Sequence, residues 1–400
     1  MSVAAKPVIL IFVGRYLPGF KAGGIISCVA NIVNHLHGEF DFRIVTRDRD
    51  LGENNPYEGI KPYVWQIVGN ASVYYLPPNL ETASQIRRII NETPHDLLYL
   101  NSFFEPLNIK VLINCMLRQI DRAPILLTPH GEFAWPSFCQ KYTKKVVFIR
   151  LARLLKLYAP VTWHAASTVE AEDAMRVMHL RSQSIHIAAQ LPPIVEDDFD
   201  DPANHQSIRE EQGIRIFFFA RISPEKNLDY ALKVLGRVTV RVRFDIIGPI
   251  ENVAYWNECE LLIRKLPSHV IVRSVGSIQP AKLKETLRRY DLLLFPSAGE
   301  AYGQVIAESL INGTQVLIST NTPWRDLLAK GLGWDLPLND IDAFVRVIDE
   351  VGSETTVARL QRRKLVKENM KKFTSESAAI SDVRNLFNTL ISRENNSRSA

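Results

Sequence analysis

The stretch that decides the fold is FPSAGEAYGQVIAE, residues 295–308. An apolar run, Leu292–Phe295, leads into it and predicts a buried strand. A turn follows, and we predict that a helix begins near Gly303. Glu300 then lies in the loop after the strand, and Glu308 lies inside the helix. Such a strand–loop–helix unit is typical of α/β folds, in which ligands bind beyond the carboxyl ends of the strands.

The predicted helix start can attract phosphate. The amides of Gly303, Gln304 and Val305 point out of a helix N-terminus, where unpaired donors and the helix dipole favour an anion. Glu300 can then face a sugar on one side of the phosphate, and Glu308 can bind ribose hydroxyls on the other. A plainer interpretation stays open, in which Glu300 is an ordinary N-terminal acid and Glu308 a solvated helix residue.

A second informative stretch is FFFARISPEKNL, residues 217–228. A strand runs directly into Arg221, and Ser223-Pro224 with Lys226 predicts a helix start. Arg221 and Lys226 flank one turn, so both can reach a diphosphate at the strand end, the first through a forked guanidinium and the second as a point charge. The alternative is that both are ordinary solvated surface residues.

Working outward, short apolar runs alternate with amphipathic stretches, which predicts an α/β fold with parallel sheets. The predicted strands are Val8–Val13, Phe42–Val45, Leu97–Leu100, Ile125–Thr128, Thr162–Ala165, Ile216–Ala220, Arg243–Ile247, Val270–Arg273, Leu292–Phe295 and Gln315–Ser319. Predicted helices include Ile26–Leu36, Leu80–Asn91, Leu228–Val238 and Lys282–Arg289. The alternation breaks at residues 189–213, around the acidic run Glu196 to Asp201, and we predict a linker there.

Length and composition fit this organisation. The chain has 400 residues, 46% of them hydrophobic and 23% charged, which favours two soluble globular domains and excludes a disordered or coiled-coil chain. The net charge of +5 is too weak to indicate nucleic-acid binding. Four scattered cysteines suit a reducing compartment. We find no secretory signal and no apolar run long enough to span a membrane, so we expect a cytoplasmic protein.

The two motif stretches together resemble the GT-B fold retaining glycosyltransferases marked by an E-x7-E motif, of the glycosyltransferase family 4 type and its bacterial surface polysaccharide group. Glu300 and Glu308 match that motif, and Arg221 and Lys226 match the strand–Arg–turn–Lys element. Further matching segments, in the same order along the chain, are Thr128-Pro129-His130-Gly131, His164-Ala165-Ala166-Ser167 with Glu170, Gly313-Thr314-Gln315-Val316, Thr322–Leu327 and Gly333-Trp334.

The resemblance implies two Rossmann-like domains with a central cleft. It implies an N-terminal acceptor-side domain at residues 1–190, a nucleotide-sugar-binding domain at 191–370, and a crossing helix with a frayed tail at 371–400. The implied reaction is metal-independent transfer of a hexose from a nucleotide diphosphate donor to a glycan or lipid-linked acceptor, with retention of configuration. We favour a front-face route in which Glu300 orients the sugar, and a nucleophilic role for Glu300 stays open.

Roles follow from the resemblance, residue by residue. Glu300 and His130 are expected at the reaction centre, and Glu308 at the donor ribose. The expected donor-diphosphate set is Arg221, Lys226, Gly303, Gln304 and Val305, with Gly23 and Gly24 from a glycine-rich loop after the first strand. Adjacent glycines allow a close backbone approach, although Gly-Gly is also common in flexible turns.

We expect no metal and no cofactor beyond the donor substrate. Asp48-Arg49-Asp50 is a D-x-D pattern, which binds metal in a different glycosyltransferase fold, but here we expect a solvated turn. Where the family usually has Gly-Phe-Gly after the first glutamate, this chain has Ala301-Tyr302-Gly303, which leaves the donor sugar open. Two alternatives also stay open: a sugar-nucleotide epimerase of the same fold, and a non-catalytic nucleotide-sugar-binding assembly subunit.

The positive charge is concentrated between Lys110 and Lys156, where nine Lys and Arg face Asp121 and Glu132, a net charge of +7. Residues 141–156 within it predict a basic amphipathic helix. We expect this helix to contact an anionic membrane at the inner face of the plasma membrane, on the acceptor side. The basic residues that we expect to make this membrane contact are Lys141, Lys144, Lys145, Arg150 and Arg153. The alternative is a packing helix with a solvated face. We expect a second basic run, Arg359–Lys372, to be an exposed helix face.

Overall fold

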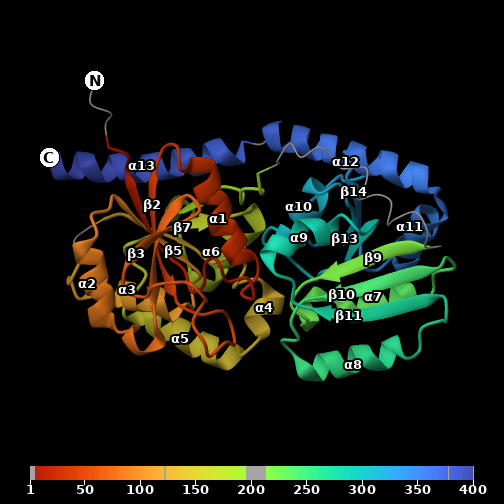
Figure 1. Cartoon of the computed structure of the whole chain (residues 1–400). Helices are drawn as coiled ribbons and strands as arrows, with labels where there is room; N and C mark the ends of the chain where they lie inside the picture. Colours follow the sequence, from red (N-terminus) through yellow and green to blue (C-terminus); the bar gives the residue numbers. More distant parts are fainter. Residues whose placement is uncertain (1–4, 121–122, 195–212, 377, 400) are drawn as a thin grey trace. The chain divides into compact units, whose positions relative to one another are not determined.

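The structure is a computed structural model that describes residues 5–120, 123–194, 213–376 and 378–399. The chain forms two compact units, each described by itself: unit 1 holds Met1–Leu191 and Ala378–Ala400, and unit 2 holds Pro192–Ser377 (Figure 1). The acidic run of the predicted linker, Glu196 to Asp201, lies outside the described residues.

Unit 1 is built on one sheet of order β3-β4-β2-β1-β5-β6-β7-β8 within its described residues. The strands are β1 (Val8–Phe12), β2 (Asp41–Arg47), β3 (Trp65–Val68), β4 (Ala71–Leu76), β5 (Leu97–Asn101), β6 (Ile125–Thr128), β7 (Val161–Ala165) and β8 (Ile185–Ile187). Neighbouring strands run parallel, except that β3 pairs antiparallel with β4. Both faces are covered by helices, as expected for a mainly parallel sheet.

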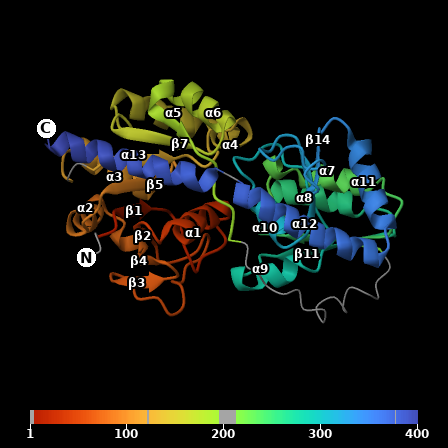
Figure 2. The same ribbon diagram turned by 90° about the horizontal axis from the view of Figure 1, so that it is seen from above.

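Alternate side chains of β1 enter two different cores. Ile9 and Ile11 pack in the cluster that includes α1 and α13, whereas Leu10 and Phe12 pack in the cluster that includes α2, α3 and α5. The helices are α1 (Gly24–Leu36), α2 (Ala83–Glu92), α3 (Pro106–Met116), α4 (Trp135–Cys139), α5 (Tyr142–Leu154), α6 (Thr168–Met178) and α13 (Ala379–Ser399). Figure 2 shows α13 crossing over β5 with α1 beside it, in agreement with their contacts.

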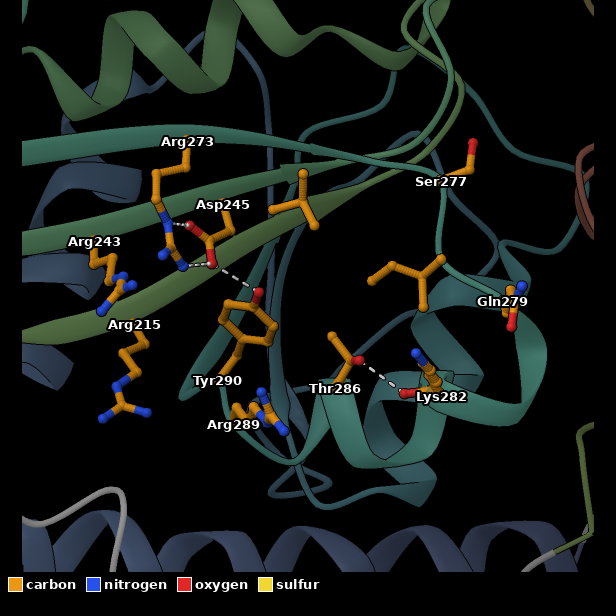
Figure 3. Close-up of a pocket in the computed structure, with 12 residues that line it drawn as sticks. Arg215, Arg243, Asp245, Arg273, Ser277, Gln279, Lys282, Thr286, Arg289 and Tyr290 are labelled. Carbon is orange, nitrogen blue, oxygen red and sulfur yellow. Dashed lines mark hydrogen bonds and ion pairs between the residues drawn. The ribbon is translucent and has the colours of Figure 1, made fainter.

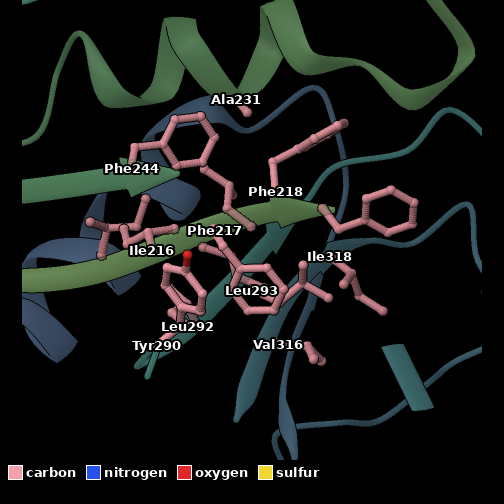
Figure 4. Close-up of a cluster of buried hydrophobic side chains, with 14 of the residues drawn as sticks. Ile216, Phe217, Phe218, Ala231, Phe244, Tyr290, Leu292, Leu293, Val316 and Ile318 are labelled. Atoms are coloured by element: carbon pink, nitrogen blue, oxygen red, sulfur yellow. The ribbon is translucent and has the colours of Figure 1, made fainter. Parts of the chain in front are cut away.

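Unit 2 has a fully parallel sheet of order β11-β10-β9-β12-β13-β14. The strands are β9 (Ile214–Phe219), β10 (Val242–Ile247), β11 (Val270–Gly276), β12 (Leu292–Phe295), β13 (Gln315–Ser319) and β14 (Gly333–Leu336). The helices are α7 (Leu228–Leu235), α8 (Val253–Ile263), α9 (Pro280–Leu287), α10 (Gln304–Ile311), α11 (Ile341–Ser353) and α12 (Thr356–Glu376). Successive residues of β9 alternate between its two faces, and Figure 4 shows this buried cluster around the strand.

The structure confirms the predicted α/β class and every predicted strand, with end shifts of a few residues. It adds β3, β4, β8 and β14. The β3–β4 hairpin is joined by Gly69-Asn70, a two-residue turn signal between alternating apolar residues that the sequence prediction overlooked. The other two added strands, of three and four residues, are too short to produce a clear periodic pattern.

The C-terminal helices differ from expectation in two ways. Helix α13 continues to Ser399, whereas we expected residues 371–400 to end in a frayed tail, and no Gly or Pro interrupts the chain there. In α12, which belongs to unit 2, the arginines of the basic run point toward the rest of that unit rather than forming an exposed face. Arg359 donates to the Gly213 carbonyl at 2.9 Å and pairs with Asp291 at 3.3 Å. Among the described residues, no helix has both the length and the apolar character needed to cross a membrane.

Gly248, the first residue after β10, gives a test of this packing. Its φ is +134°, and an added Cβ would lie 1.8 Å from the Ala220 carbonyl oxygen. We expect Gly248→Ala to lower the free energy of unfolding of unit 2 by about 2–4 kcal/mol, since backbone must move. Urea denaturation measures this effect. Gly236→Ala is the control, because that site has ordinary contacts and helical backbone, and an equal loss in both variants would contradict the account.

Candidate functional site

In unit 2, strand pairing brings the two motif loops together. Strands β9 and β12 are parallel neighbours, so their carboxyl ends lie at the same edge of the sheet. The loop after β12 is hydrogen-bonded to the turn after β9. The Ala298 amide donates to the Glu225 carbonyl at 2.9 Å, the Ser297 hydroxyl oxygen lies 3.2 Å from the same carbonyl, and the Asn227 side-chain amide donates to the Pro296 carbonyl at 3.0 Å. The two loops therefore form one rigid platform.

Lys226 and Glu300 meet on this platform. The Lys226 ammonium lies 2.6 Å from Glu300 Oε1, and the Ser297 hydroxyl donates to the same oxygen at 2.7 Å. The two charged side chains are 18% and 12% exposed, so the pair is reachable from solvent but largely shielded from it. A partly buried cation held at a strand end, with its position fixed by a carboxylate, can bind an anion. Sequence analysis missed Ser297, which is fully buried and lies three residues before Glu300.

Arg221 occupies a more open position in the same region. It follows β9, and its guanidinium pairs with Glu251 at 2.5 Å, with about a third of each side chain exposed. Lys226 ends a 3-10 turn, η4 (Pro224–Lys226), and α7 begins after it at Leu228, so the predicted helix start is a short turn followed by a helix. The structure thus gives Arg221 and Lys226 different carboxylate partners.

Helix α10 begins beside Glu300. Gly303 is its N-cap with φ +84°, and an added Cβ would lie 2.7 Å from Ile306 Cδ1, so this position requires glycine. The Ile306 amide already donates to the Gly303 carbonyl at 2.9 Å. Gln304 and Val305 form the first turn, where Gln304 is buried, and Glu308 is the fifth residue of the helix. The predicted strand–loop–helix unit is therefore present with its two glutamates on the loop and in the helix.

In unit 1, His130 lies at the carboxyl end of the sheet. It follows β6, next to β5, and its φ of +51° is left-handed. Its Nε2 lies 3.0 Å from Asn101 Oδ1, and Gln190 Nε2 lies 3.4 Å from its Nδ1. Burial, and secondarily His164, lower the pKa of His130 to about 3, so the imidazole is neutral at pH 7. With Asn101 Oδ1 as acceptor, the ring proton is on Nε2.

Two carboxylates that the sequence analysis did not place at a site brace the His130 loop. Glu132 accepts from the Ser102 hydroxyl at 2.6 Å and from the Phe103 amide at 2.5 Å. Glu170 accepts from the Gly131 amide at 2.5 Å and from the Ala166 amide at 2.7 Å. The signal for Glu132 was its place two residues after His130, just beyond a buried strand.

The glycine-rich loop of unit 1 lies at the start of α1. Gly23 is the N-cap with φ +77° and Gly24 is the first helical residue, and a Cβ on Gly23 would meet nothing within 4 Å, so the backbone angle alone favours glycine there. Asp50 holds the preceding residues through the amides of Phe20, at 2.8 Å, and Lys21, at 3.1 Å.

The burial of Asp48 and Asp50 overturns the prediction of a solvated turn at Asp48-Arg49-Asp50. Asp48 is 3% and Asp50 5% exposed, because Asp50 accepts backbone hydrogen bonds and Asp48 pairs with Arg49 at 2.8 Å. Both aspartates therefore have structural partners. Across the described ranges, no three His, Cys, Asp or Glu side chains gather where they could hold a metal ion.

Helix α5 contains most of the predicted membrane-facing residues. Lys141 is its left-handed N-cap residue, and Lys144, Arg150 and Arg153 are exposed. Lys145 instead turns inward, donates to the Ser137 carbonyl at 2.7 Å and lies 5.2 Å from the Phe104 ring centre.

The same helix exposes apolar side chains. Val147, Leu151 and Leu154, spaced four and three residues apart, share one helix face, and Leu154 is 79% exposed. Trp135 of α4 is also exposed and packs near Tyr142.

The pKa of Glu132 provides a test of the His130 loop. Burial raises it from 4.5 to about 7, against the opposing hydrogen bonds from Ser102 and two amides. Because the native state then holds the proton more tightly than the unfolded state, the contribution of Glu132 to stability is largest below pH 4.5 and is lost as the pH rises through 7. We expect Glu132→Gln to remove this decline, which is worth up to about 3 kcal/mol.

Chemical denaturation of unit 1 at pH 5 and pH 8 measures it. Glu172→Gln, on the exposed side of α6, is the matched control and should keep the wild-type pH dependence. A Glu132→Gln protein that loses stability between these pH values as steeply as the wild type would contradict the assignment.

Comparisons with known proteins relate the chain to glycosyltransferases. Residues 200–373 match the family model "Glycosyl transferases group 1". The chain is also 22% identical over 282 residues to an uncharacterised 41.2 kDa protein in the cps region of Klebsiella pneumoniae, covering 68% of this chain and 74% of that protein.

Solved structures with similar folds cover almost the whole chain. The Anabaena Alr3699/HepE complex with UDP and glucose has a TM-score of 0.67 at 16% identity, covering 96% of this chain and all of that one. Sucrose-phosphate synthase from Thermosynechococcus elongatus has a TM-score of 0.72 at 14% identity, with 97% and 100% covered. WaaG, a glycosyltransferase involved in lipopolysaccharide biosynthesis, has a TM-score of 0.60 at 14% identity, with 96% and 99% covered. The chain therefore has the GT-B fold of glycosyltransferase structures, and its second unit contains most of the segment that matches the glycosyl transferases group 1 model.

Proposed function

We propose that this protein is a retaining hexosyltransferase that moves a sugar from a nucleotide diphosphate donor to a glycan or lipid-linked acceptor. The observation that carries the proposal is the Lys226–Glu300 pair, held with Ser297 at adjoining strand ends beside the start of α10. This arrangement provides a cation, a carboxylate and a helix N-terminus in one place, which are the groups that bind a diphosphate and a sugar.

The chemistry requires negative charge to be stabilised on the leaving diphosphate as the glycosidic bond breaks. Lys226 and the N-terminal amides of α10 are the groups that we assign to this role, with Arg221 as a second, more exposed cation. Glu300 orients the sugar, and the leaving phosphate takes the acceptor proton. The reaction then needs no protein base and no metal ion, and it retains the anomeric configuration. Glu308 is assigned to the donor ribose.

Unit 1 contributes His130 in our proposal. As a neutral imidazole it accepts a hydrogen bond from a substrate hydroxyl at Nδ1, in place of the 3.4 Å contact from Gln190, without adding charge, and Asn101 fixes the ring orientation through Nε2. Gly23 and Gly24 are assigned to close backbone contact with the donor diphosphate, since only a residue without Cβ adopts the Gly23 backbone readily.

The comparisons support the substrate classes. Alr3699/HepE was crystallised with UDP and with UDP-glucose, WaaG takes part in lipopolysaccharide biosynthesis, and the Klebsiella relative is a protein of a cps region. We accordingly propose a nucleotide-sugar donor and a role in bacterial surface polysaccharide biosynthesis.

We further propose that α5 binds the inner face of the plasma membrane. The stripe of Val147, Leu151 and Leu154 is apolar and exposed, and Lys144, Arg150 and Arg153 are exposed on the same helix. An exposed apolar stripe with nearby cations fits an anionic lipid surface better than the alternative of a helix with a polar, solvated face. A neighbouring pocket of about 280 Å³, lined by Trp135 and Phe138 among others, adds apolar surface beside the helix.

The catalytic proposal predicts that Lys226→Ala and Glu300→Gln each lower the transfer rate by about 10²–10³-fold, the usual effect of removing one group that stabilises a transition state. The assay measures nucleoside diphosphate release from a panel of nucleotide sugars with and without acceptor. Lys233→Ala is the matched control, because Lys233 pairs with Asp229 on an exposed helix face and should transfer at the wild-type rate.

The same assay separates the alternatives. Release of nucleoside diphosphate only when acceptor is present supports transfer, whereas interconversion of the nucleotide sugar without release indicates an epimerase. Product with inverted anomeric configuration by NMR, or wild-type rates in Lys226→Ala, would contradict the proposal.

The membrane proposal predicts cosedimentation of the full chain with vesicles that contain phosphatidylglycerol at low salt. Leu151→Gln with Leu154→Gln should weaken binding several-fold through loss of apolar contact, and replacing Lys144, Arg150 and Arg153 by Gln should weaken it further. Arg237→Gln is the control, because this arginine is exposed in unit 2. Equal sedimentation of all these variants, or none by the wild type, would refute membrane binding by α5.

A further inference from the structure

A second, strongly basic site lies on the face of the unit 2 sheet that β9, β10 and β11 present. Arg215 and Arg243 are opposite each other in the register of β9 and β10, and Arg273 of β11 is opposite Asp245 of β10. Residues two apart on a strand share a face, so the three arginines project from the same side. Figure 3 shows them gathered at one end of a pocket that Lys282, Gln279 and Ser277 line at the other.

The pocket has a large excess of positive charge. Among the described residues that line it, five are cations, Arg289 being the fifth, and Asp245 is the one carboxylate. Asp245 is 2% exposed and accepts from Arg273 at 2.9 and 2.7 Å and from the Tyr290 hydroxyl at 2.8 Å. Because these bonds hold the carboxylate in the wall, Asp245 fixes the plane of the Arg273 guanidinium. Arg289 also contacts Glu285 on the exposed side of α9.

The size and the remaining walls indicate what kind of anion fits. The volume is about 500 Å³, within the range of pockets that hold small organic ligands and much larger than a phosphate ion needs. Ser277, Gln279 and Thr286 add hydroxyl and amide groups, and Ile278 adds an aliphatic surface. Guanidinium groups match phosphate oxygens through forked hydrogen bonds. The phosphate group of such a ligand fits the arginine end of the pocket, and its hydroxyl groups fit the end lined by Ser277 and Gln279.

We propose that this pocket, the arginine pocket, binds a small organic phosphate, either a sugar phosphate or a nucleoside monophosphate, at a site separate from the donor site. Arg215 and Arg243 lie at the amino ends of β9 and β10, whereas Lys226 and Glu300 follow the carboxyl ends of β9 and β12. The arginine end of the pocket is therefore at the opposite end of β9 from Lys226, whereas Ser277 and Gln279, at its other end, follow the carboxyl end of the edge strand β11. The binding of this ligand does not depend on the glycosyl transfer proposed above.

Isothermal titration calorimetry on the full chain tests the proposal with three probes: glucose 6-phosphate, UMP and inorganic phosphate. At least one organic phosphate should bind more tightly than inorganic phosphate. The double variant R215Q/R243Q should weaken that binding by at least about tenfold, through loss of two charge-assisted contacts. Lys282→Gln, an exposed change on α9 that should not affect folding, should weaken it several-fold. Arg237→Gln removes the same charge elsewhere in unit 2 and should have no effect.

The donor-site variant Lys226→Ala separates the two sites, and it should bind the organic phosphate as the wild type does. Three results would overturn the proposal: no binding of any probe at millimolar concentration, unchanged binding in both R215Q/R243Q and Lys282→Gln, or loss of binding in Lys226→Ala. Tighter binding of glucose 6-phosphate indicates a sugar phosphate as the ligand, and tighter binding of UMP indicates a nucleoside monophosphate.

Discussion

The hydrogen bonds that join the turn after β9 to the loop after β12 are the constraint on which the proposed chemistry depends. Parallel pairing of these two strands places the loops side by side, and the carbonyls of Glu225 and Pro296 then accept donors across the gap. Only with this connection is Lys226 held 2.6 Å from Glu300, 74 residues away in sequence. The ion pair is thus a product of sheet topology and local loop bonding together.

Burial controls the charge state in unit 1. His130 is kept neutral by desolvation, and Glu132, in a similar environment, has a pKa raised to about 7. Unit 2 shows the opposite arrangement, in which Lys226 and Glu300 stabilise each other as a charged pair. A neutral hydrogen-bonding group in one unit and paired charges in the other suit the two roles that we propose for them, binding a hydroxyl group and binding a diphosphate.

Much of the fold and part of the candidate site could be predicted from the sequence. Apolar runs between turn residues locate β6, β12 and β13 without error, because buried parallel strands have little other sequence pattern. Lys226 and Glu300 were identifiable because they lie in the turn and the loop that follow such runs. The contacts of Ser297 and Glu132 and the burial of Asp50 were not, since each depends on backbone groups that the fold brings from distant segments. The arginine pocket was missed for the same reason: its cations come from separate strands and from α9.

The most direct test of the central claim is calorimetric titration of the full chain with UDP, GDP, ADP, CDP and TDP, in wild type and in Lys226→Met. The account predicts that at least one of these diphosphates binds the wild-type protein and that Lys226→Met weakens its binding at least about tenfold, since a charge-assisted contact to phosphate is lost while the chain length is kept. Equal affinity for both proteins, or no binding of any of the five, would contradict the claim that Lys226 holds the donor diphosphate.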